Sequence, residues 1–442
     1  MRRFVAGLFV LALWAGAAFA QEEVWREQMT DGMGLYQQGR YAEAEEKFSA
    51  ALKEAEPFGP DDPRLASSLN NLASLYAALG QAARGEPLSR QALAIREKAL
   101  GPQHPDVAQS LDNLGSILAA LGQYPQAEPL FQRALLIREK ALGPEHPDVA
   151  QTLNNLAELY RARGKAVQAE PLCNRALAIQ EKALGPEHAD VATSLNDLAG
   201  IHLSRGQYGE AEALYRRALA IREKALDPEH PLVATSLNNL GVLHLARGQA
   251  AEADPLFKRA LTIQEKALGP EHPQVATTLN NQALLLTIKG RYAEAEPLYK
   301  RALTIDEKAL GPEHPSVATD LNGFAMLSAV RRQGAKAETL YRRALAIRER
   351  VLGPEHPDGA TTLNNLGVLY FEQERFREAE ALFQRAQAIR EKALGRGHPD
   401  VAITLENYAE LLRKTHREGY AVEWEGRAAR VRARYAKESA MK

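Results

Sequence analysis

The chain has 442 residues, of which 45% are hydrophobic and 25% are charged, and its formal net charge is −1. These proportions are typical of an ordered globular protein and exclude a disordered chain. A charge balance this close to neutral argues against nucleic acid and against a membrane surface as partners, because both usually require a strongly basic face. The single cysteine, Cys173, allows no internal disulfide, and packing within a helix is its expected role.

The first segment, residues 1–20, has the pattern of a targeting sequence. Arg2 and Arg3 precede an apolar run from Phe4 to Trp14, and Ala18-Phe19-Ala20 supplies small residues at the end. This pattern predicts a secretory signal peptide that is cut before Gln21, so the mature protein is expected to be exported, either to a periplasm or to the medium. An uncleaved membrane anchor is the alternative, which the shortness of the run disfavours. No membrane insertion is expected after cleavage.

Residues 21–60 predict one short pair of helices that caps the start of a longer array. The glycine and aromatic residues of this segment match those of the longer repeat described next; they are Gly34, Tyr36, Gly39, Tyr41 and Phe48.

Residues 61–424 consist of a 42-residue unit that recurs without insertion or deletion. A His-Pro pair marks most copies, beginning at His104, His146, His230, His272, His314, His356 and His398, with His188-Ala189 and Asp62-Pro63 at the equivalent positions. Self-similarity at a fixed period indicates a solenoid, in which each repeat buries its apolar face against its neighbours.

One copy, residues 143–184, predicts two helices. Apolar residues at helical spacing favour a first helix from about Pro147 to Ala162 and a second from about Ala166 to Leu184, with Gly164 in the turn between them. Pro147 suits the first helical position, and His146 is then expected to be the N-cap. The acidic residues of runs such as Arg96-Glu97-Lys98 are expected on the solvated outer face of the second helix.

Small residues recur in both helices of every copy, as at Gly115 and Ala157 in the first and at Ala134 and Ala176 in the second. They mark places where two helices approach closely. This combination of positions resembles the tetratricopeptide repeat, in particular the 42-residue version of kinesin light chains, over about residues 62–439. The resemblance implies an all-α, right-handed superhelical solenoid of antiparallel helix pairs.

Residues 425–442 complete the chain as a basic capping helix, with Arg427, Arg430, Arg432, Arg434 and Lys437. A polar outer face is expected of a terminal repeat, which no neighbour covers. A solvated cap is therefore favoured over an arm that binds nucleic acid.

The chemistry-bearing residues give no sign of an enzyme, a metal site or a cofactor. The marker histidines belong to different repeats, about one helix spacing apart, which is too far for two imidazoles to share a zinc ion. The sequence has no glycine-rich phosphate loop, zinc-protease signature or serine nucleophile elbow. We therefore expect no cofactor and no catalytic activity.

The informative polar signal is a Leu-Asn-Asn sequence in the first helix of most repeats. Asparagine is a mediocre helix former, so paired asparagines within a helix need a compensating role. Their amides either bind a ligand or bond to the neighbouring repeat, and these alternatives remain open. The resemblance implies that first helices line the concave face, where an apolar strip accompanies the amides. The candidate peptide-binding residues are Asn154, Asn155, Asn196, Asn238, Asn239, Val242, Asn280, Asn281, Leu284, Asn322, Met326, Asn364, Asn365 and Val368.

These features predict an exported, monomeric scaffold that binds an unidentified peptide or protein segment in a concave groove. A self-associating structural protein of the cell envelope is one alternative. A scaffold for polysaccharide assembly is another, which the scarcity of aromatic residues in the groove disfavours.

Overall fold

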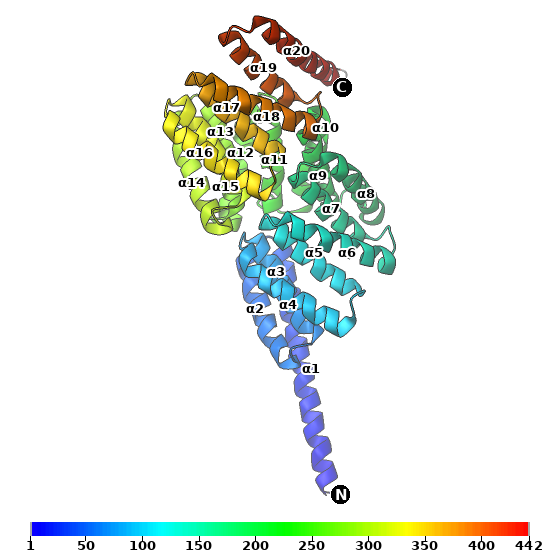
Figure 1. The fold of residues 1–442 in the computed structure, drawn as a ribbon. Coiled ribbons are helices and arrows are strands. Elements are labelled where there is room, and N and C mark those ends of the chain that lie inside the picture. Colours follow the sequence, from blue (N-terminus) through cyan, green and yellow to red (C-terminus); the bar gives the residue numbers. More distant parts are fainter. Residues whose placement is uncertain (1, 441–442) are drawn as a thin grey trace. The chain divides into compact units, whose positions relative to one another are not determined.

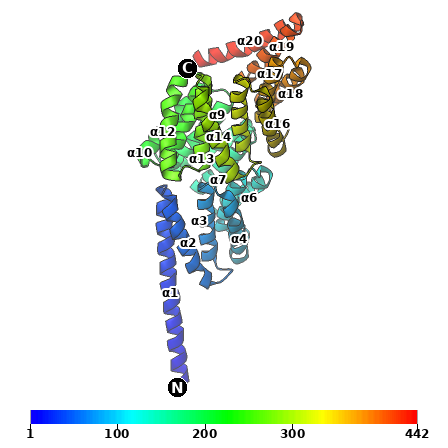
Figure 2. The same cartoon turned by 90° about the vertical axis from the view of Figure 1, so that its left-hand side faces the viewer.

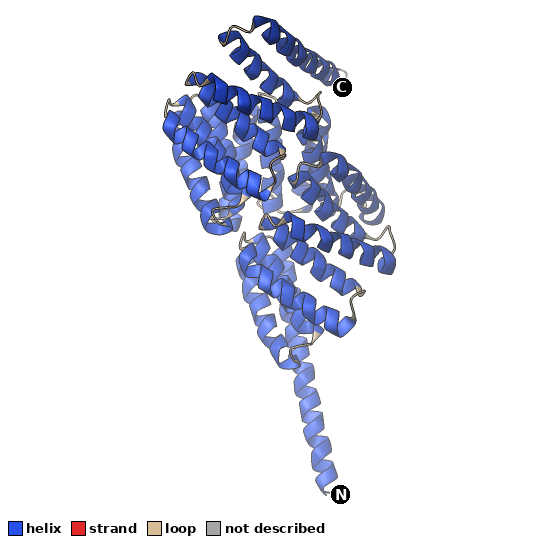
Figure 3. Cartoon of the chain, viewed as in Figure 1, coloured by secondary structure: helices blue, strands red, loops and turns tan. Residues whose placement is uncertain are grey.

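The computed structural model describes the backbone of residues 2–440 and the side chains of residues 20–433. All regular elements within that range are helices (Figure 3), which confirms the predicted all-α class. The chain divides into two compact units, residues 1–152 and residues 153–442, and each is described by itself. In both units the two helices of a repeat pack directly against each other, and then against the next repeat (Figure 1).

The N-terminal unit contains the short pair and the first two long repeats. Its elements are α1 (Arg2–Gln37), α2 (Tyr41–Ala55), the 3-10 turn η1 (Glu56–Phe58), α3 (Pro63–Ala78), α4 (Ala82–Leu100), α5 (Pro105–Ala120) and α6 (Tyr124–Leu142). Helix α1 continues through the predicted cleavage point before Gln21, and cleavage there stays a prediction. A search of the described residues finds no helix with the length and apolarity that a membrane span needs.

The C-terminal unit contains the remaining repeats, with α7 beginning just before the unit boundary. Its helices are α7 (Pro147–Ala162), α8 (Ala166–Leu184), α9 (Ala189–Ser204), α10 (Tyr208–Ala225), α11 (Pro231–Ala246), α12 (Ala250–Leu268), α13 (Pro273–Ile288), α14 (Tyr292–Leu310), α15 (Pro315–Val330), α16 (Gly334–Val351), α17 (Pro357–Glu372), α18 (Phe376–Leu394), α19 (Pro399–Lys414) and α20 (Glu418–Ala440). The bounds predicted from residues 143–184 are those of α7 and α8. The expected boundary between residues 424 and 425 falls inside α20.

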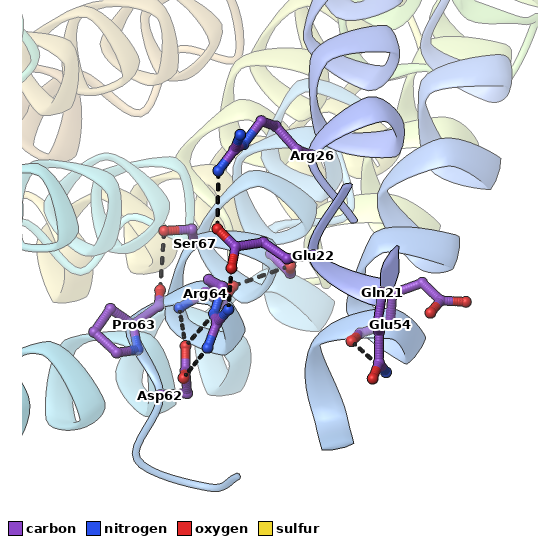
Figure 4. Close-up of polar contacts among 9 residues, drawn as sticks. Gln21, Glu22, Arg26, Glu54, Asp62, Pro63, Arg64 and Ser67 are labelled. Atoms are coloured by element: carbon purple, nitrogen blue, oxygen red, sulfur yellow. Dashed lines mark hydrogen bonds and ion pairs between the residues drawn. The ribbon is translucent and has the colours of Figure 1, made fainter. Parts of the chain in front are cut away.

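Each first helix of the long repeats begins at a capping side chain, as predicted. The Nδ1 atom of His146 accepts a hydrogen bond from the backbone N–H of Asp148 at 3.1 Å. In the first long repeat, Asp62 Oδ1 accepts in the same way from the N–H of Arg64, at 2.8 Å (Figure 4). A cap satisfies an N–H group that has no partner within its helix, and the proline that follows has none to satisfy.

The residues after the predicted cleavage point are held by the first hairpins. Gln21 Nε2 donates to the backbone oxygen of Glu54 at 3.1 Å, and Glu22 accepts from Arg64 Nη1 at 2.9 Å (Figure 4). Trp25 Nε1 donates to Ser68 Oγ at 2.8 Å. The start of the predicted mature chain is therefore part of the packed structure.

Small residues permit close helix packing within each repeat, which confirms that expectation. Ala157 and Ala176 are fully buried. A Cβ atom at Gly115 would lie 2.8 Å from the Phe131 ring, which is closer than van der Waals contact allows. A larger side chain at this position would force α5 and α6 apart.

A buried polar link joins each second helix to the first helix of the next repeat. Arg222 Nη1 donates to Ser236 Oγ at 3.0 Å and to the backbone oxygen of Leu232 at 3.0 Å. The donor belongs to an Arg-Glu-Lys run whose acidic residue was expected on the solvated face, whereas Arg222 itself is only 2% exposed. The same link occurs in the pairs Arg96–Ser110, Arg138–Thr152, Arg348–Thr362 and Arg390–Thr404, and a glutamine takes the place of the arginine in Gln180–Ser194 and Gln264–Thr278.

Two capping histidines of the C-terminal unit make a second contact, to a repeat far earlier in the chain. The Nε2 atom of His356 lies 3.0 Å from the backbone oxygen of Ala162, and that of His398 lies 2.9 Å from the oxygen of Ser204. In both cases the partners are 194 residues apart, so the solenoid comes back alongside itself within this unit. We call these two hydrogen bonds the turn contacts.

The turn contacts require glycine in the loop that they meet. Gly164 and Gly206 have φ of +70° and +73°, and a Cβ atom on either would lie 2.7 Å from Cδ of Pro357 or Pro399. Both the left-handed backbone and the close approach therefore exclude a side chain.

The two histidines that make the turn contacts are buried. The side chains of His356 and His398 are 5% and 7% exposed, whereas that of His188, at the start of α9, is 46% exposed. Burial is the main cause that lowers the pKa of His356 and of His398. Since Nδ1 accepts the capping N–H, the neutral ring carries its proton on Nε2 and donates it to the carbonyl.

Replacing His356 and His398 by asparagine tests the turn contacts. Asparagine keeps the N-cap but is too short to reach the distant carbonyl. We expect hydrogen exchange in the turns after α7 and α9 to become about fivefold faster, the effect of losing roughly 1 kcal/mol. The variant His188→Asn is the matched control, and equal exchange in both variants would contradict the assignment.

Candidate functional site

The first helices form the inner side of the curved array in the C-terminal unit. Successive first helices contact each other directly, from α9 to α11, α13, α15, α17 and α19. Among the described residues, successive second helices are not in close contact with each other. First helices therefore follow the shorter, concave path. Figure 2 shows the first helix α13 beside α14, the second helix of the same repeat.

Most amides at the first position of the Leu-Asn-Asn sequence point into the stack. Five of the six in the candidate set are buried, namely Asn154, Asn196, Asn238, Asn280 and Asn364. Asn154 Nδ2 donates to Ser194 Oγ at 2.7 Å, and Asn196 Nδ2 donates to Ser236 Oγ at 3.0 Å. These hydroxyls are the ones that Gln180 and Arg222 also contact, so the amides belong to the link between repeats.

The amides further along the array bond to the second position of the next repeat. Asn238 Oδ1 accepts from Asn281 Nδ2 at 3.0 Å, and Asn322 Oδ1 accepts from Asn365 Nδ2 at 3.4 Å. Asn364 accepts in the same way from Asn407 at 3.0 Å. The two asparagine positions are therefore brought together between repeats. The structure shows that these asparagines contact each other and the hydroxyls of the next repeat. Contact between any of them and a ligand stays a prediction.

The second-position amides and the apolar strip are the more accessible part of the candidate set. Asn322 and all of these residues are half-buried: Asn155, Asn239, Val242, Asn281, Leu284, Met326, Asn365 and Val368. At the end of the same helices, Ile288 and Val330 are 60% and 48% exposed. The first helices from α11 to α17 therefore present a continuous series of apolar side chains flanked by amides. We call this series the apolar strip.

A charged cluster, which the sequence analysis missed, lies next to the apolar strip on α7 and α9. Glu158 and Arg161 form a two-pronged ion pair, with Arg161 Nε and Nη2 at 2.6 Å and 2.5 Å from the carboxylate oxygens. Asp197 takes the second asparagine position in α9 and Gly200 follows one turn later, with space for a Cβ at 3.5 Å from both Arg161 Cδ and the Tyr215 hydroxyl. The departures from the repeat pattern at Glu158, Asp197 and Gly200 were the available signal.

Asp197 is the unpaired member of this cluster. Among the described residues, none donates a hydrogen bond or forms an ion pair to its carboxylate. Burial, together with the nearby charge of Glu158, raises the pKa of Asp197 to about 7, against the opposing effects of Arg161 and Arg222. A carboxylate in this state is stabilised by a cationic group that comes near it.

The buried Cys173 has a packing role, as expected. It is fully buried between α7, α9 and its own helix α8, and burial raises the pKa of its thiol. A thiol in this state is not a nucleophile at neutral pH. The described residues also hold no group of three or more histidine, cysteine or acidic side chains arranged for a metal ion.

A hollow of about 400 Å³ is lined by residues of α16, α17 and α18. Arg342, Leu345, Tyr370 and Leu382 are among its lining residues. Tyr370 is bonded there to Arg342 and Glu338, at 2.8 Å each. With these polar groups paired to each other, the hollow gives less sign of a ligand than the inner face does.

Comparison with known proteins identifies the repeat. The sequence profile described as tetratricopeptide repeat matches residues 32–84, 66–131, 106–170, 148–224, 200–266, 232–308, 274–334, 328–392 and 360–434. No curated protein matches the chain.

Several solved structures are similar to the chain. A putative kinesin light chain with nearly identical repeats from Podosopora anserina is 32% identical over 46% of this chain and 97% of its own, with a TM-score of 0.37. BtubC (BKLC) from P. vanneervenii is 26% identical over 53% of this chain and 92% of its own, with a TM-score of 0.38. A Rap protein complexed with Competence and Sporulation Factor is 16% identical over 84% of this chain and 99% of its own, with a TM-score of 0.63, which is a likeness of fold alone.

The variant Asn238→Ala tests whether a first-position amide supports the stack. The substitution leaves the Nδ2 donor of Asn281 without its acceptor, while Thr278 keeps its hydrogen bond to Gln264. We therefore expect the free energy of unfolding to fall by about 1–3 kcal/mol in urea titrations. Asn239→Ala is the control, because Asn239 is half-buried and makes no side-chain hydrogen bond among the described residues. An equal loss in both variants would show that the amide–hydroxyl contact is not what matters.

Proposed function

Since the chain belongs to the tetratricopeptide repeat family, whose helical scaffolds typically mediate protein–protein interaction, we propose that it is an exported, non-enzymatic scaffold that holds an extended peptide on the inner face of its C-terminal unit. The observation that carries this proposal is the apolar strip, which is half-buried, continuous over several repeats and bordered by amides. Amides can bond to the backbone of an extended segment while apolar side chains take its side chains.

The charged cluster suggests which peptide fits. Asp197 is unpaired and its carboxylate is partly desolvated, so a lysine, arginine or amino terminus placed beside it would relieve an unfavourable charge. Glu158 already has its partner in Arg161. The proposed occupant is a peptide with apolar side chains along α11 to α17 and one basic group beside α9.

Two observations support a binding role over the alternatives. The Rap protein, which shares the fold, was solved complexed with a factor. The terminal helix α20 carries exposed charged residues, including Arg432 paired with Glu406, which suits an end that no second copy covers. A monomer that works alone is therefore proposed over an end-to-end polymer.

A random peptide display library provides the test of binding. We expect the wild-type protein to retain peptides rich in apolar residues with one basic residue, and Leu284→Asp to lose them because a charge would enter the apolar strip. Lys258→Ala on the outer helix α12 is the control and is expected to bind as the wild type does. Retention by Leu284→Asp at wild-type level would refute the inner face as the site.

The same peptides can distinguish the role of Asp197. With its pKa near 7, the carboxylate is ionised above neutral pH, so affinity is expected to rise by about tenfold between roughly pH 6 and pH 8. Asp197→Asn removes that dependence. If peptides without a basic residue bind equally well at both pH values, the proposed specificity for a basic group is refuted, while the proposed binding site on the inner face is not.

Export is tested by fractionating cells that express the full chain. We expect the mature protein outside the cytoplasm, with Gln21 as its first residue in N-terminal sequencing. Recovery of the uncut chain from the cytoplasm would contradict this part of the proposal without affecting the binding site.

A further inference from the structure

One junction between repeats breaks the pattern of the buried polar link. Asp306 on α14 stands where Gln264 and Arg348 stand in the neighbouring repeats, and Asp320 on α15 stands where they have Thr278 and Thr362. Elsewhere an arginine donates to the hydroxyl at this place, as Arg348 does, or a glutamine oxygen accepts from it, as that of Gln264 does. Here two carboxyl groups meet, and neither supplies a hydrogen-bond donor when both are ionised.

Both carboxyl groups are inside the protein and contact each other. Asp306 and Asp320 are 1% and 2% exposed, and their side chains are hydrogen-bonded to one another. A hydrogen bond between two carboxyl groups requires that one of them carry a proton. The remaining oxygens, Asp306 Oδ1 and Asp320 Oδ2, have no partner among the described residues.

The surroundings offer the pair no compensating positive charge. Among the described residues, no basic side chain lies within ion-pair distance of either carboxyl. Glu307 on α14 adds a like charge near Asp320. From α13, Asn280 places its unpartnered Oδ1 against Gly323, one turn beyond Asp320.

The histidines and arginines of the adjoining helices are engaged elsewhere. His314 caps the start of α15 by accepting from Ser316. On the far side, Arg348 of α16 donates to Thr319 and Thr362. Neutralisation of the pair therefore has to come from a proton.

We propose that Asp306 and Asp320 form a shared-proton pair that holds the α14–α15 junction together in neutral and acidic solution and loosens it in alkaline solution. Two buried charges of the same sign in contact are strongly unfavourable, so loss of the proton is coupled to separation of the helices. The junction lies within the proposed peptide groove, because α13 carries Leu284 and α15 carries Met326. The pair is thus a pH-sensitive joint within the groove.

The direction of the effect follows from proton linkage. Burial raises the pKa of Asp306 to about 7, and burial together with Asp306 raises that of Asp320 well above its ordinary value. The folded chain then holds protons that the unfolded chain releases above about pH 4. The stabilisation is complete below that pH and is lost as the pH rises through about 7 and beyond.

The double variant Asp306→Gln with Asp320→Thr is the matched comparison, because it recreates the Gln264–Thr278 link of the preceding repeat. Hydrogen exchange of α14 and α15 in the full chain, corrected for intrinsic rates, is compared at about pH 6 and about pH 9. We expect the opening constant of these helices to rise by about tenfold or more in the wild type and to stay constant in the variant. Taking the difference cancels contributions from other groups, such as His356.

Two results would overturn the proposal. An equal pH response in the wild type and the double variant would show that the pair does not titrate with the opening. Protection of α14 and α15 at about pH 9 by millimolar calcium chloride, in the wild type alone, would show that a cation and not a proton neutralises the carboxyl groups. Binding of peptides at neutral pH is unaffected by either result, so the proposed function is tested separately.

Discussion

The buried link from a second helix to the next first helix is the interaction on which the rest of the structure depends. Each repeat is too small to fold alone, so its position relative to the next decides the path of the whole array. Apolar contacts between alanine and leucine side chains supply attraction but little orientation. The arginine or glutamine that reaches one hydroxyl, as Arg222 reaches Ser236, has a partner at only one register. Slippage would leave a buried guanidinium unsatisfied, which is costly.

Repetition of one register has long-range consequences. A constant rotation per repeat brings the chain back alongside itself within the C-terminal unit, where His356 meets the carbonyl of Ala162. The capping histidine then has two roles, because one ring nitrogen accepts from its own helix and the other donates to an earlier turn. Gly164 is needed at the meeting point for its backbone conformation and for its lack of a side chain.

The departures from the repeat pattern are where individual functions are proposed. On the inner face, Asp197 and Gly200 take the positions that Asn239 and Val242 hold in the next repeat. They therefore put a charged group next to the apolar strip. Asp306 and Asp320 replace a donor and a hydroxyl, and they turn one rigid link into a titratable one. The repeated positions supply the apolar strip, and the exceptions supply the charged and titratable groups near it.

The sequence alone was sufficient for the helices, their caps and their close packing, because these depend on contacts within one repeat and the period places them without ambiguity. The residues 143–184 predicted α7 and α8 at their observed bounds, and His146 as a cap. What the sequence left open was the direction in which polar side chains point. Asn154 and Arg222 look solvent-facing or ligand-facing in a single repeat, and only the neighbouring repeat, stacked in its register, buries them. The turn contacts could not be predicted from the sequence, because they join residues that are 194 positions apart. They depend on the accumulated rotation of several repeats, which is a property of the tertiary structure that no local pattern encodes.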